Sequence, residues 1–312
     1  MKFKTEFALL VLLAVSSGWQ AQAADPVSLV VLGTAQDGGY PQAGCQKSCY
    51  KDAWASHSLR RFVSSIAVVD VKSSQRWLFD CTPDFKDQLR LLDAAVPSLS
   101  QEPLSGILLT HAHIGHYAGL IHLGREVMGS RGVPVYAMPR MKYFLESNGP
   151  WSQLVSLNQI KIQKITPGSR FSLSERVAVT AIPVPHRDEF SETVAFKIEG
   201  PNRSALFLPD IDKWDKWAVR IEDLISQVDF AFLDATFFDS GELKGRDMSE
   251  IPHPFVVESI ERFKILPESE RQKIHFIHLN HSNPLLQNGH PSRQRVVDAG
   301  HQIAKQGTSF EL

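Results

Sequence analysis

Short apolar runs of strand length alternate with amphipathic helical segments along almost the whole chain. Strands are predicted at Val27 to Gly33, Phe62 to Val71, Arg76 to Phe79, Gly106 to Thr110, Val177 to Val184, Thr193 to Ile198, Ser204 to Leu208, Asp229 to Leu233 and Ile274 to Leu279, and near Val135 and Ile160. Helices are predicted from Pro83 onward and at His116 to Met128, Trp214 to Val228, Phe255 to Phe263 and Pro291 to Gln306. Strands in meander order with helices between and after them favour two sheets covered by helices on their outer faces. The sequence therefore predicts an α/β fold built as a four-layer αββα sandwich.

The N-terminal segment has the composition of a secretory signal. Lys2 and Lys4 precede an apolar run from Phe7 to Val15, and Ala21-Gln22-Ala23 forms a small-x-small cleavage site. The run is shorter than the roughly 20 residues that a membrane-spanning helix needs. We expect a signal peptide at residues 1–23, a single domain at residues 24–312, and export to the periplasm or the medium without a membrane anchor.

The charge balance limits the partners that the chain can bind. The 33 basic and 34 acidic residues nearly cancel, and basic side chains form no run interleaved with aromatic ones. This pattern argues against a nucleic-acid partner, which requires a basic surface. We expect a small-molecule substrate, and the sequence leaves the oligomeric state open.

Three histidines lie within six residues in the segment His111-Ala-His-Ile-Gly-His116. The segment leaves a predicted strand and enters a predicted helix, so its imidazoles can converge on one point. Imidazole is a common ligand of zinc, iron and manganese, and a chance histidine-rich turn is the alternative. The segment therefore predicts a metal centre.

The same segment resembles the His-x-His-x-Asp-His signature of the metallo-β-lactamase superfamily, entered from an apolar strand that ends at Thr110. The resemblance implies two metals that share a bridging carboxylate. It assigns His111, His113 and His186 to the first metal, His116 and His278 to the second, and Asp210 to the bridge.

One position departs from the signature, because Gly115 stands where the superfamily has the Asp ligand of the second metal. Three outcomes are open. The site holds a single metal, a second metal is held weakly by His116 and His278, or another residue such as His253 substitutes for the missing ligand.

Carboxylates at strand ends are further candidates. Asp210 follows Ala205-Leu-Phe-Leu-Pro209, and His186 follows a similar apolar strand, although an Asp in such a place is often only a turn former. Asp80 resembles the early superfamily Asp that orients a histidine ligand by accepting its other ring N–H. Asp234, at the end of another strand, has either that role or a direct contact with metal.

A closer resemblance within the superfamily is to the pyrroloquinoline quinone biosynthesis protein B group and the related phosphonate-pathway phosphodiesterases. The stretches that carry it are Leu32-Gly-Thr-Ala-Gln-Asp-Gly-Gly-Tyr-Pro-Gln42, Asp234-Ala-Thr-Phe237 and Phe276-Ile-His-Leu-Asn-His-Ser-Asn-Pro284. These relatives often carry a separate structural zinc, which here implies Cys45, Cys49 and His281 as its ligands. A disulfide between Cys45 and Cys49 is the alternative in an exported protein. Cys81 is expected to be a small buried residue rather than a nucleophile.

These observations favour a metal-dependent hydrolase that acts on a small ester, phosphodiester or lactam. Zinc is the expected metal, as one or two ions, with manganese or iron as alternatives. Asp210 would orient the attacking water, and His253 would protonate the leaving group. Two alternatives stay open, namely an iron-dependent redox or oxygen-using enzyme related to quinone-cofactor biosynthesis, and a metal-binding protein without turnover.

Overall fold

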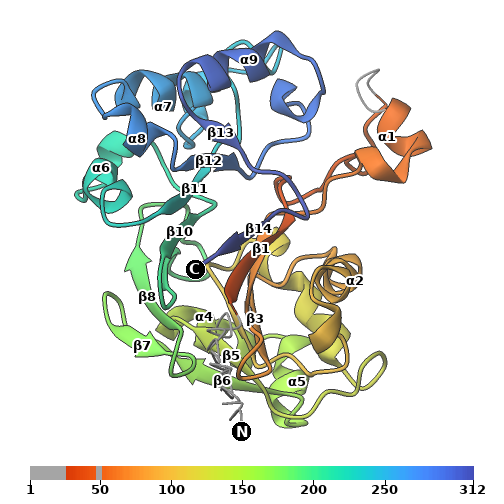
Figure 1. The fold of residues 1–312 in the computed structure, drawn as a ribbon. Coiled ribbons are helices and arrows are strands. Elements are labelled where there is room, and N and C mark those ends of the chain that lie inside the picture. Colours follow the sequence, from red (N-terminus) through yellow and green to blue (C-terminus); the bar gives the residue numbers. More distant parts are fainter. Residues whose placement is uncertain (1–25, 47–50) are drawn as a thin grey trace, which may run out of the picture.

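Two β-sheets pack face to face and carry helices on their outer faces, as the sequence predicts (Figure 1). The computed structural model describes residues 26–46 and 51–312. The predicted signal peptide at residues 1–23 and the predicted zinc ligand Cys49 lie outside the described residues. Among the described residues, no helix is both long and apolar enough to cross a membrane.

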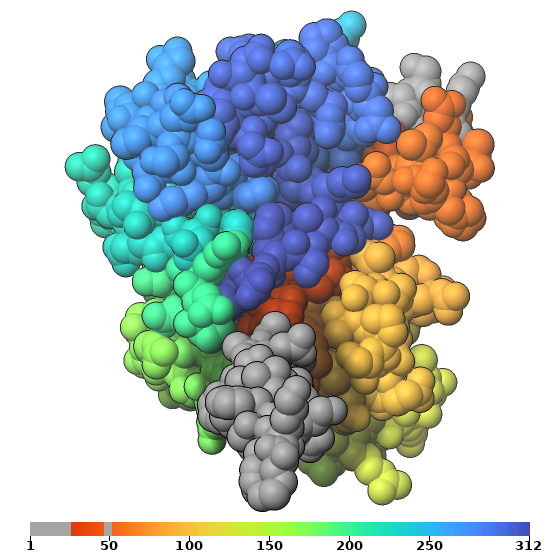
Figure 2. Space-filling view, in the orientation of Figure 1, coloured from red at the N-terminus to blue at the C-terminus, as the bar shows by residue number. Residues whose placement is uncertain are grey.

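The first sheet has seven strands in the order β14-β1-β2-β3-β4-β5-β6. They are β1 (Val27–Gly33), β2 (Ser65–Asp70), β3 (Gln75–Phe79), β4 (Gly106–Leu108), β5 (Val133–Ala137), β6 (Ile160–Lys164) and β14 (Ser309–Glu311). Strand β14 comes from the far end of the chain and pairs antiparallel with β1. Figure 2 shows this C-terminal segment, in blue, lying beside the red N-terminal strand.

The second sheet also has seven strands, in the order β13-β12-β11-β10-β9-β8-β7. They are β7 (Arg170–Ser172), β8 (Ala178–Pro183), β9 (Val194–Glu199), β10 (Ser204–Leu208), β11 (Phe230–Asp234), β12 (Ile274–Ile277) and β13 (Gln302–Ile303). Strand β10 shows why both faces of this sheet are covered. Ala205 and Phe207 point into the core between the sheets, while Leu206 and Leu208 point into a second core beneath the outer helices.

The helices divide between the two sheets. The first sheet is covered by α2 (Phe85–Ala95), α4 (Pro139–Ser147) and α5 (Trp151–Ser156), and the second by α6 (Ile221–Ile225), α7 (Val256–Phe263) and α9 (Pro291–Asp298). Three shorter helices are α1 (Lys51–Ala55), α3 (Ile114–Tyr117) and α8 (Glu268–Arg271).

Aromatic rings fill the core between the two sheets. The Phe79 ring packs edge to face against the Phe196 ring, with 5.4 Å between centroids, and against the Phe207 ring, with 6.4 Å between centroids.

Strand direction brings several loops to one edge of the sandwich. Strands β1, β3 and β4 run in the same direction in the first sheet, and β8, β10, β11 and β12 do so in the second. A parallel bridge between Ala35 and Leu279 joins the loop after β1 to the end of β12. The loops that follow these strands therefore meet between the two sheets, and loops at such an edge are where sites are built.

Three helix predictions are wrong in extent. The helix predicted from His116 to Met128 is the short α3 followed by a 3-10 helix that ends at Leu123. The helix predicted from Pro291 to Gln306 ends at Asp298, because Gly300 takes up a left-handed backbone (φ +86°) and the chain then forms β13 beside β12. The helix predicted from Trp214 to Val228 is a short 3-10 turn followed by α6. Between them Trp217 is extended, and its indole N–H donates to the Pro183 carbonyl at 3.1 Å.

Candidate metal centre

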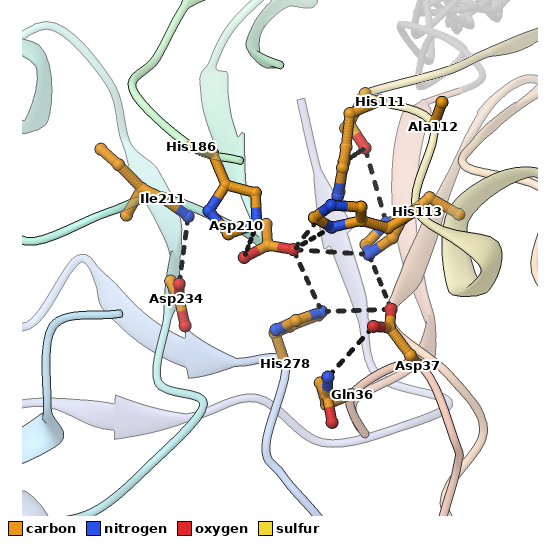
Figure 3. Close-up of polar contacts among 12 residues, drawn as sticks. Gln36, Asp37, His111, Ala112, His113, His186, Asp210, Ile211, Asp234 and His278 are labelled. Atoms are coloured by element: carbon orange, nitrogen blue, oxygen red, sulfur yellow. Dashed lines mark hydrogen bonds and ion pairs between the residues drawn. The ribbon is translucent and has the colours of Figure 1, made fainter. Parts of the chain in front are cut away.

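The predicted metal ligands leave strand ends at the edge where the two sheets meet (Figure 3). His111 lies three residues beyond β4, His186 three residues beyond β8, and Asp210 two residues beyond β10. His278 directly follows β12 and has a left-handed backbone (φ 64°), which is unusual for a residue with a side chain. Strands of both sheets therefore contribute to the site.

Four side chains form a first ligand group in which every offered atom lies within 4.8 Å of the others. The members are His111, His113, His186 and Asp210. Asp210 Oδ2 lies 3.2 Å from His111 Nε2 and 3.8 Å from His113 Nδ1, and Asp210 Oδ1 lies 3.2 Å from His186 Nε2. This is the set that the superfamily resemblance assigns to the first metal.

The nitrogens that face the centre are buried and lack a hydrogen-bond partner. They are His111 Nε2, His113 Nδ1, His116 Nε2, His186 Nε2 and His278 Nε2, and the carboxylate atoms Asp37 Oδ1 and Asp210 Oδ1 share this property. Leaving a buried polar atom unpaired is costly, and native structures contain few such atoms. Their concentration around one point fits a divalent cation, for which imidazole and carboxylate are ordinary ligands.

The other ring nitrogen of each of these five histidines contacts an oxygen. The pairs are His111 Nδ1 with Thr110 Oγ1 (2.9 Å), His113 Nε2 with Glu189 Oε2 (3.4 Å), His116 Nδ1 with Asp80 Oδ2 (2.7 Å), His186 Nδ1 with Asp212 Oδ1 (3.2 Å) and His278 Nδ1 with Thr236 Oγ1 (2.9 Å). Such a partner fixes the tautomer and the ring orientation of a metal-binding imidazole. When a neutral ring donates its one proton to this outer oxygen, the inward nitrogen keeps a lone pair that can bind a cation.

Asp80 organises the first half of the site. It is fully buried, and its Oδ1 accepts hydrogen bonds from the Thr110 N–H (2.8 Å) and the Thr110 hydroxyl (2.9 Å). Because that hydroxyl donates to Asp80, its lone pair is available to accept from His111 Nδ1–H. Asp80 thus holds His116 directly and His111 through Thr110, which places it in the orienting position that the resemblance implies.

Asp234 repeats this pattern in the second half. Its Oδ1 accepts from the Thr236 N–H (2.8 Å) and the Thr236 hydroxyl (2.6 Å), and that hydroxyl faces His278 Nδ1. Its Oδ2 contacts His253 Nδ1 at 2.8 Å. The two sheets therefore carry matching Asp–Thr–His units on opposite sides of the centre.

A second ligand group contains Asp37, which the sequence analysis did not identify. Asp37, His116 and His278 offer atoms within 4.8 Å of one another. Two features of the sequence could have indicated Asp37. It lies in the loop after β1, and Gly115 leaves the second metal without its usual carboxylate. Asp212 and Glu189, which contact His186 and His113, were also missed, because neither stands at a strand end.

His253 belongs to a third ligand group, with Asp210 and Asp234, and not to the second group. Its Nδ1 is hydrogen bonded to Asp234 Oδ2 at 2.8 Å and lies 3.2 Å from Asp210 Oδ1. Its role as a substitute ligand therefore stays a prediction. The space beside Gly115 is filled by Asp37.

The buried charges favour ionised carboxylates. Burial alone raises the pKa of Asp210, but the neighbouring imidazoles, first His186 and then His278, hold that pKa well below its ordinary value. The pKa of Asp37 is likewise lowered, because His116 and His278 outweigh the effect of burial. Burial lowers the pKa of His253, yet Asp234 and Asp210 raise it to about 10. Against the effect of burial, neighbouring carboxylates also raise the pKa of His186 to about 9 and that of His116 well above its ordinary value, so a cation that binds these rings would displace protons from them.

The predicted structural zinc stays a prediction. Cys45 is partly buried with a free thiol, and Cys49 lies outside the described residues. Neither Cys45 nor His281 belongs to a metal-type group of described residues. Cys81 is fully buried, as expected, and burial beside Asp80 raises the pKa of its thiol well above the ordinary value.

Comparison with known proteins places this geometry in a family. The family model described as the β-lactamase superfamily domain matches residues 75–279, which include strands β3 to β12 and every member of the ligand groups except Asp37. The chain belongs to the metallo-β-lactamase superfamily. Its two ligand groups occupy the edge at which the sheets of this superfamily fold meet.

Relatives within the superfamily match over almost the full chain. Coenzyme PQQ synthesis protein B of Methylorubrum extorquens (strain PA1) is 26% identical over 310 residues, which cover 91% of this chain and 99% of the relative. The crystal structure of Zn(2+)-bound PqqB from Methylobacterium extorquens has a TM-score of 0.74 and 24% identity, covering 91% of this chain and all of that chain. A diphosphatase from the PhnP family has a TM-score of 0.62 and 20% identity, and the match covers 92% of this chain and 97% of the diphosphatase chain. These likenesses show the shared fold, and the zinc-bound neighbour together with the ligand groups supports metal binding.

Proposed function

We propose that this chain is a zinc-dependent hydrolase that cleaves small phosphodiesters or related esters. The observation that carries the proposal is the convergence of a four-residue ligand group beside a buried histidine. The group is His111, His113, His186 and Asp210, and the histidine is His253. A bound divalent zinc would lower the pKa of a water molecule toward about 7 and polarise the bond to be cleaved.

Asp210 is suited to orient the attacking water. Both of its oxygens face the centre, with Oδ2 toward His111 and Oδ1 toward His186. The carboxyl stays ionised because its pKa is held low, so it can accept a hydrogen bond from water. Only 2% of its side chain is exposed, which keeps bulk water from competing for that bond.

His253 is suited to protonate the leaving group. Asp234 holds its Nδ1, so Nε2 is the ring nitrogen left for a substrate oxygen. Asp234 is itself fixed by hydrogen bonds from the Thr236 N–H (2.8 Å) and the Ile211 N–H (3.1 Å). The phosphodiester preference is supported by fold neighbours described as a PhnP-family diphosphatase and the short form of human tRNase Z.

The first experiment measures metal content and turnover on the same preparation. Elemental analysis should find zinc, and bis(p-nitrophenyl) phosphate should be hydrolysed at a rate that falls on chelation and returns with zinc. His186→Ala should lose both zinc and turnover. Full zinc occupancy without hydrolysis of phosphodiesters, esters, lactones or β-lactams would refute the proposed activity.

A second experiment tests His253 through the leaving group. His253→Gln should keep its zinc but lose about 10²- to 10⁴-fold in turnover of alkyl phosphodiesters, which need a proton on departure. The loss should be much smaller for p-nitrophenyl esters, whose leaving group departs unprotonated. His122→Gln, which alters an imidazole stacked on Phe85 outside the ligand groups, is the matched control. Equal losses on both substrates, or loss of zinc, would remove His253 from this role.

A second candidate function is an iron-dependent, oxygen-using step in the synthesis of a quinone cofactor. It is favoured by the 26% identity to coenzyme PQQ synthesis protein B over 91% of this chain. Iron rather than zinc in the purified protein would favour this candidate. Metal binding without any turnover would favour a binding protein.

A further inference from the structure

We propose that Asp37 is a ligand of a second metal and replaces the carboxylate that the superfamily signature carries at position 115. The inference rests on the metal-dependent function proposed above, but it concerns metal binding and not turnover. It explains how a chain with Gly115 keeps a complete second position, which the sequence alone left undecided.

The distances around Asp37 match a cation position. Asp37 Oδ1 lies 3.2 Å from His116 Nε2 and 3.9 Å from His278 Nε2. Asp210 Oδ2 lies 3.8 Å from His116 Nε2 and 3.9 Å from His278 Nε2. Neighbouring ligands of a tetrahedral zinc with bonds of about 2.0–2.1 Å are about 3.3–3.4 Å apart. Small inward shifts of these four side chains would therefore complete the coordination shell.

The ligand atoms of Asp37, His116 and His278 face one another across this group. Asp37 Oδ1, His116 Nε2 and His278 Nε2 are buried without a hydrogen-bond partner. The side chains of His116 and His278 are fully buried. Asp37 Oδ2 accepts a hydrogen bond from the Gln36 amide at 3.0 Å, which orients the carboxylate and leaves Oδ1 pointing into the group (Figure 3).

Gly115 is required for Asp37 to occupy this place. A Cβ atom at position 115 would lie 2.2 Å from Asp37 Oδ1 and 2.6 Å from Asp37 Cα. Contacts below 3.0 Å force one partner to move, and the Asp37 Cα atom is backbone. A side chain at position 115 would therefore push the loop after β1, and the Asp37 carboxylate with it, away from this place.

The backbone holds Asp37 in register with the second sheet. The Gln36 N–H donates to the Leu279 carbonyl, and the Leu279 N–H donates to the Thr34 carbonyl, both at 2.8 Å. This pairing sets the loop after β1 directly beside His278. The position of Asp37 is therefore defined by main-chain hydrogen bonds and does not depend on a flexible side chain.

The test is removal of the Asp37 carboxylate followed by zinc counting. The full-length chain and its variants are stripped with chelator, dialysed against zinc, and analysed for zinc per chain and for zinc affinity by calorimetry. We expect two zinc ions in the natural chain and one in each of the variants Asp37→Asn and Asp37→Ala. Asp84→Asn, which alters a nearby carboxylate bonded to the Val63 N–H, should keep both ions.

Two results would overturn the inference. They are a single zinc in the natural chain, and two zinc ions bound with unchanged affinity in Asp37→Asn and Asp37→Ala. Loss of hydrolysis does not enter this test. If the natural chain binds two zinc ions but cleaves no substrate, the proposed hydrolase function is refuted and the role of Asp37 still holds.

Discussion

Replacing Asp80 with Asn should weaken one metal position without unfolding the protein. Asp80 has a left-handed backbone (φ 66°), which Asn adopts as readily, so the main chain should not change. The Asn carbonyl can still accept from Thr110. Its amide, however, would donate to His116 Nδ1, where the carboxylate now lies at 2.7 Å. The proton of His116 would then move to Nε2, the nitrogen that must bind metal.

The size of the effect follows from this single lost contact. Removing the partner that orients a metal-binding histidine costs about 10- to 100-fold in affinity, or about 1.4–2.7 kcal/mol. We expect this loss at the position that contains His116. The position built on His111, His113 and His186 should change much less, because Thr110 still contacts His111 Nδ1.

Competition with a chromophoric chelator would measure the two affinities separately. Asp84→Asn is the matched control, since the Asp84 carboxylate accepts from the Val63 N–H and belongs to none of the ligand groups. That variant should bind zinc at the His116 position as the natural chain does. If Asp80→Asn bound both metals with unchanged affinity, the conclusion that Asp80 sets the His116 tautomer would be refuted.

Three further predictions concern stability. Phe79→Ala should destabilise the fold by about 3–5 kcal/mol in urea unfolding, because this ring fills the core between the sheets; a loss below about 1 kcal/mol would contradict that placement. His275 is packed among aromatic rings, and its burial lowers the pKa to about 4. Stability should therefore fall as pH drops from about 6.5 to 4, by up to about 3 kcal/mol, and His275→Gln should flatten that profile if the assignment is right. Removing zinc should lower the free energy of unfolding by about 2.7 kcal/mol per position when free zinc had been a hundredfold above Kd, and the melting temperature should fall with it. An unchanged melting temperature would mean that folding and zinc binding are not linked.

The layered fold and the first ligand group could be predicted because their signals are local. Apolar strand runs, and the placement of His111, His186 and Asp210 just beyond them, can be recognised without knowing how the strands pair. The role of Asp37 could not be recognised in this way. It depends on the close approach of Asp37 to Gly115 and on the bridge between Ala35 and Leu279, and both are contacts between distant segments.

The C-terminal errors have a similar origin. The segment after Asp298 has helix-forming residues, but Gly300 and the free edge of β12 favour a strand there. Strand β14 was missed because it is short and pairs with β1, nearly the full chain length away. Local propensity is a weak guide where a distant strand edge offers backbone hydrogen bonds.

The division of the ligands between the two sheets has a consequence for how the protein matures. The first group takes His111 and His113 from one sheet and His186 and Asp210 from the other, and the second group is divided in the same way. Neither half of the chain can assemble a full coordination shell before the halves have docked. We therefore expect the full coordination shell, and with it tight zinc binding, to form only when the two sheets dock.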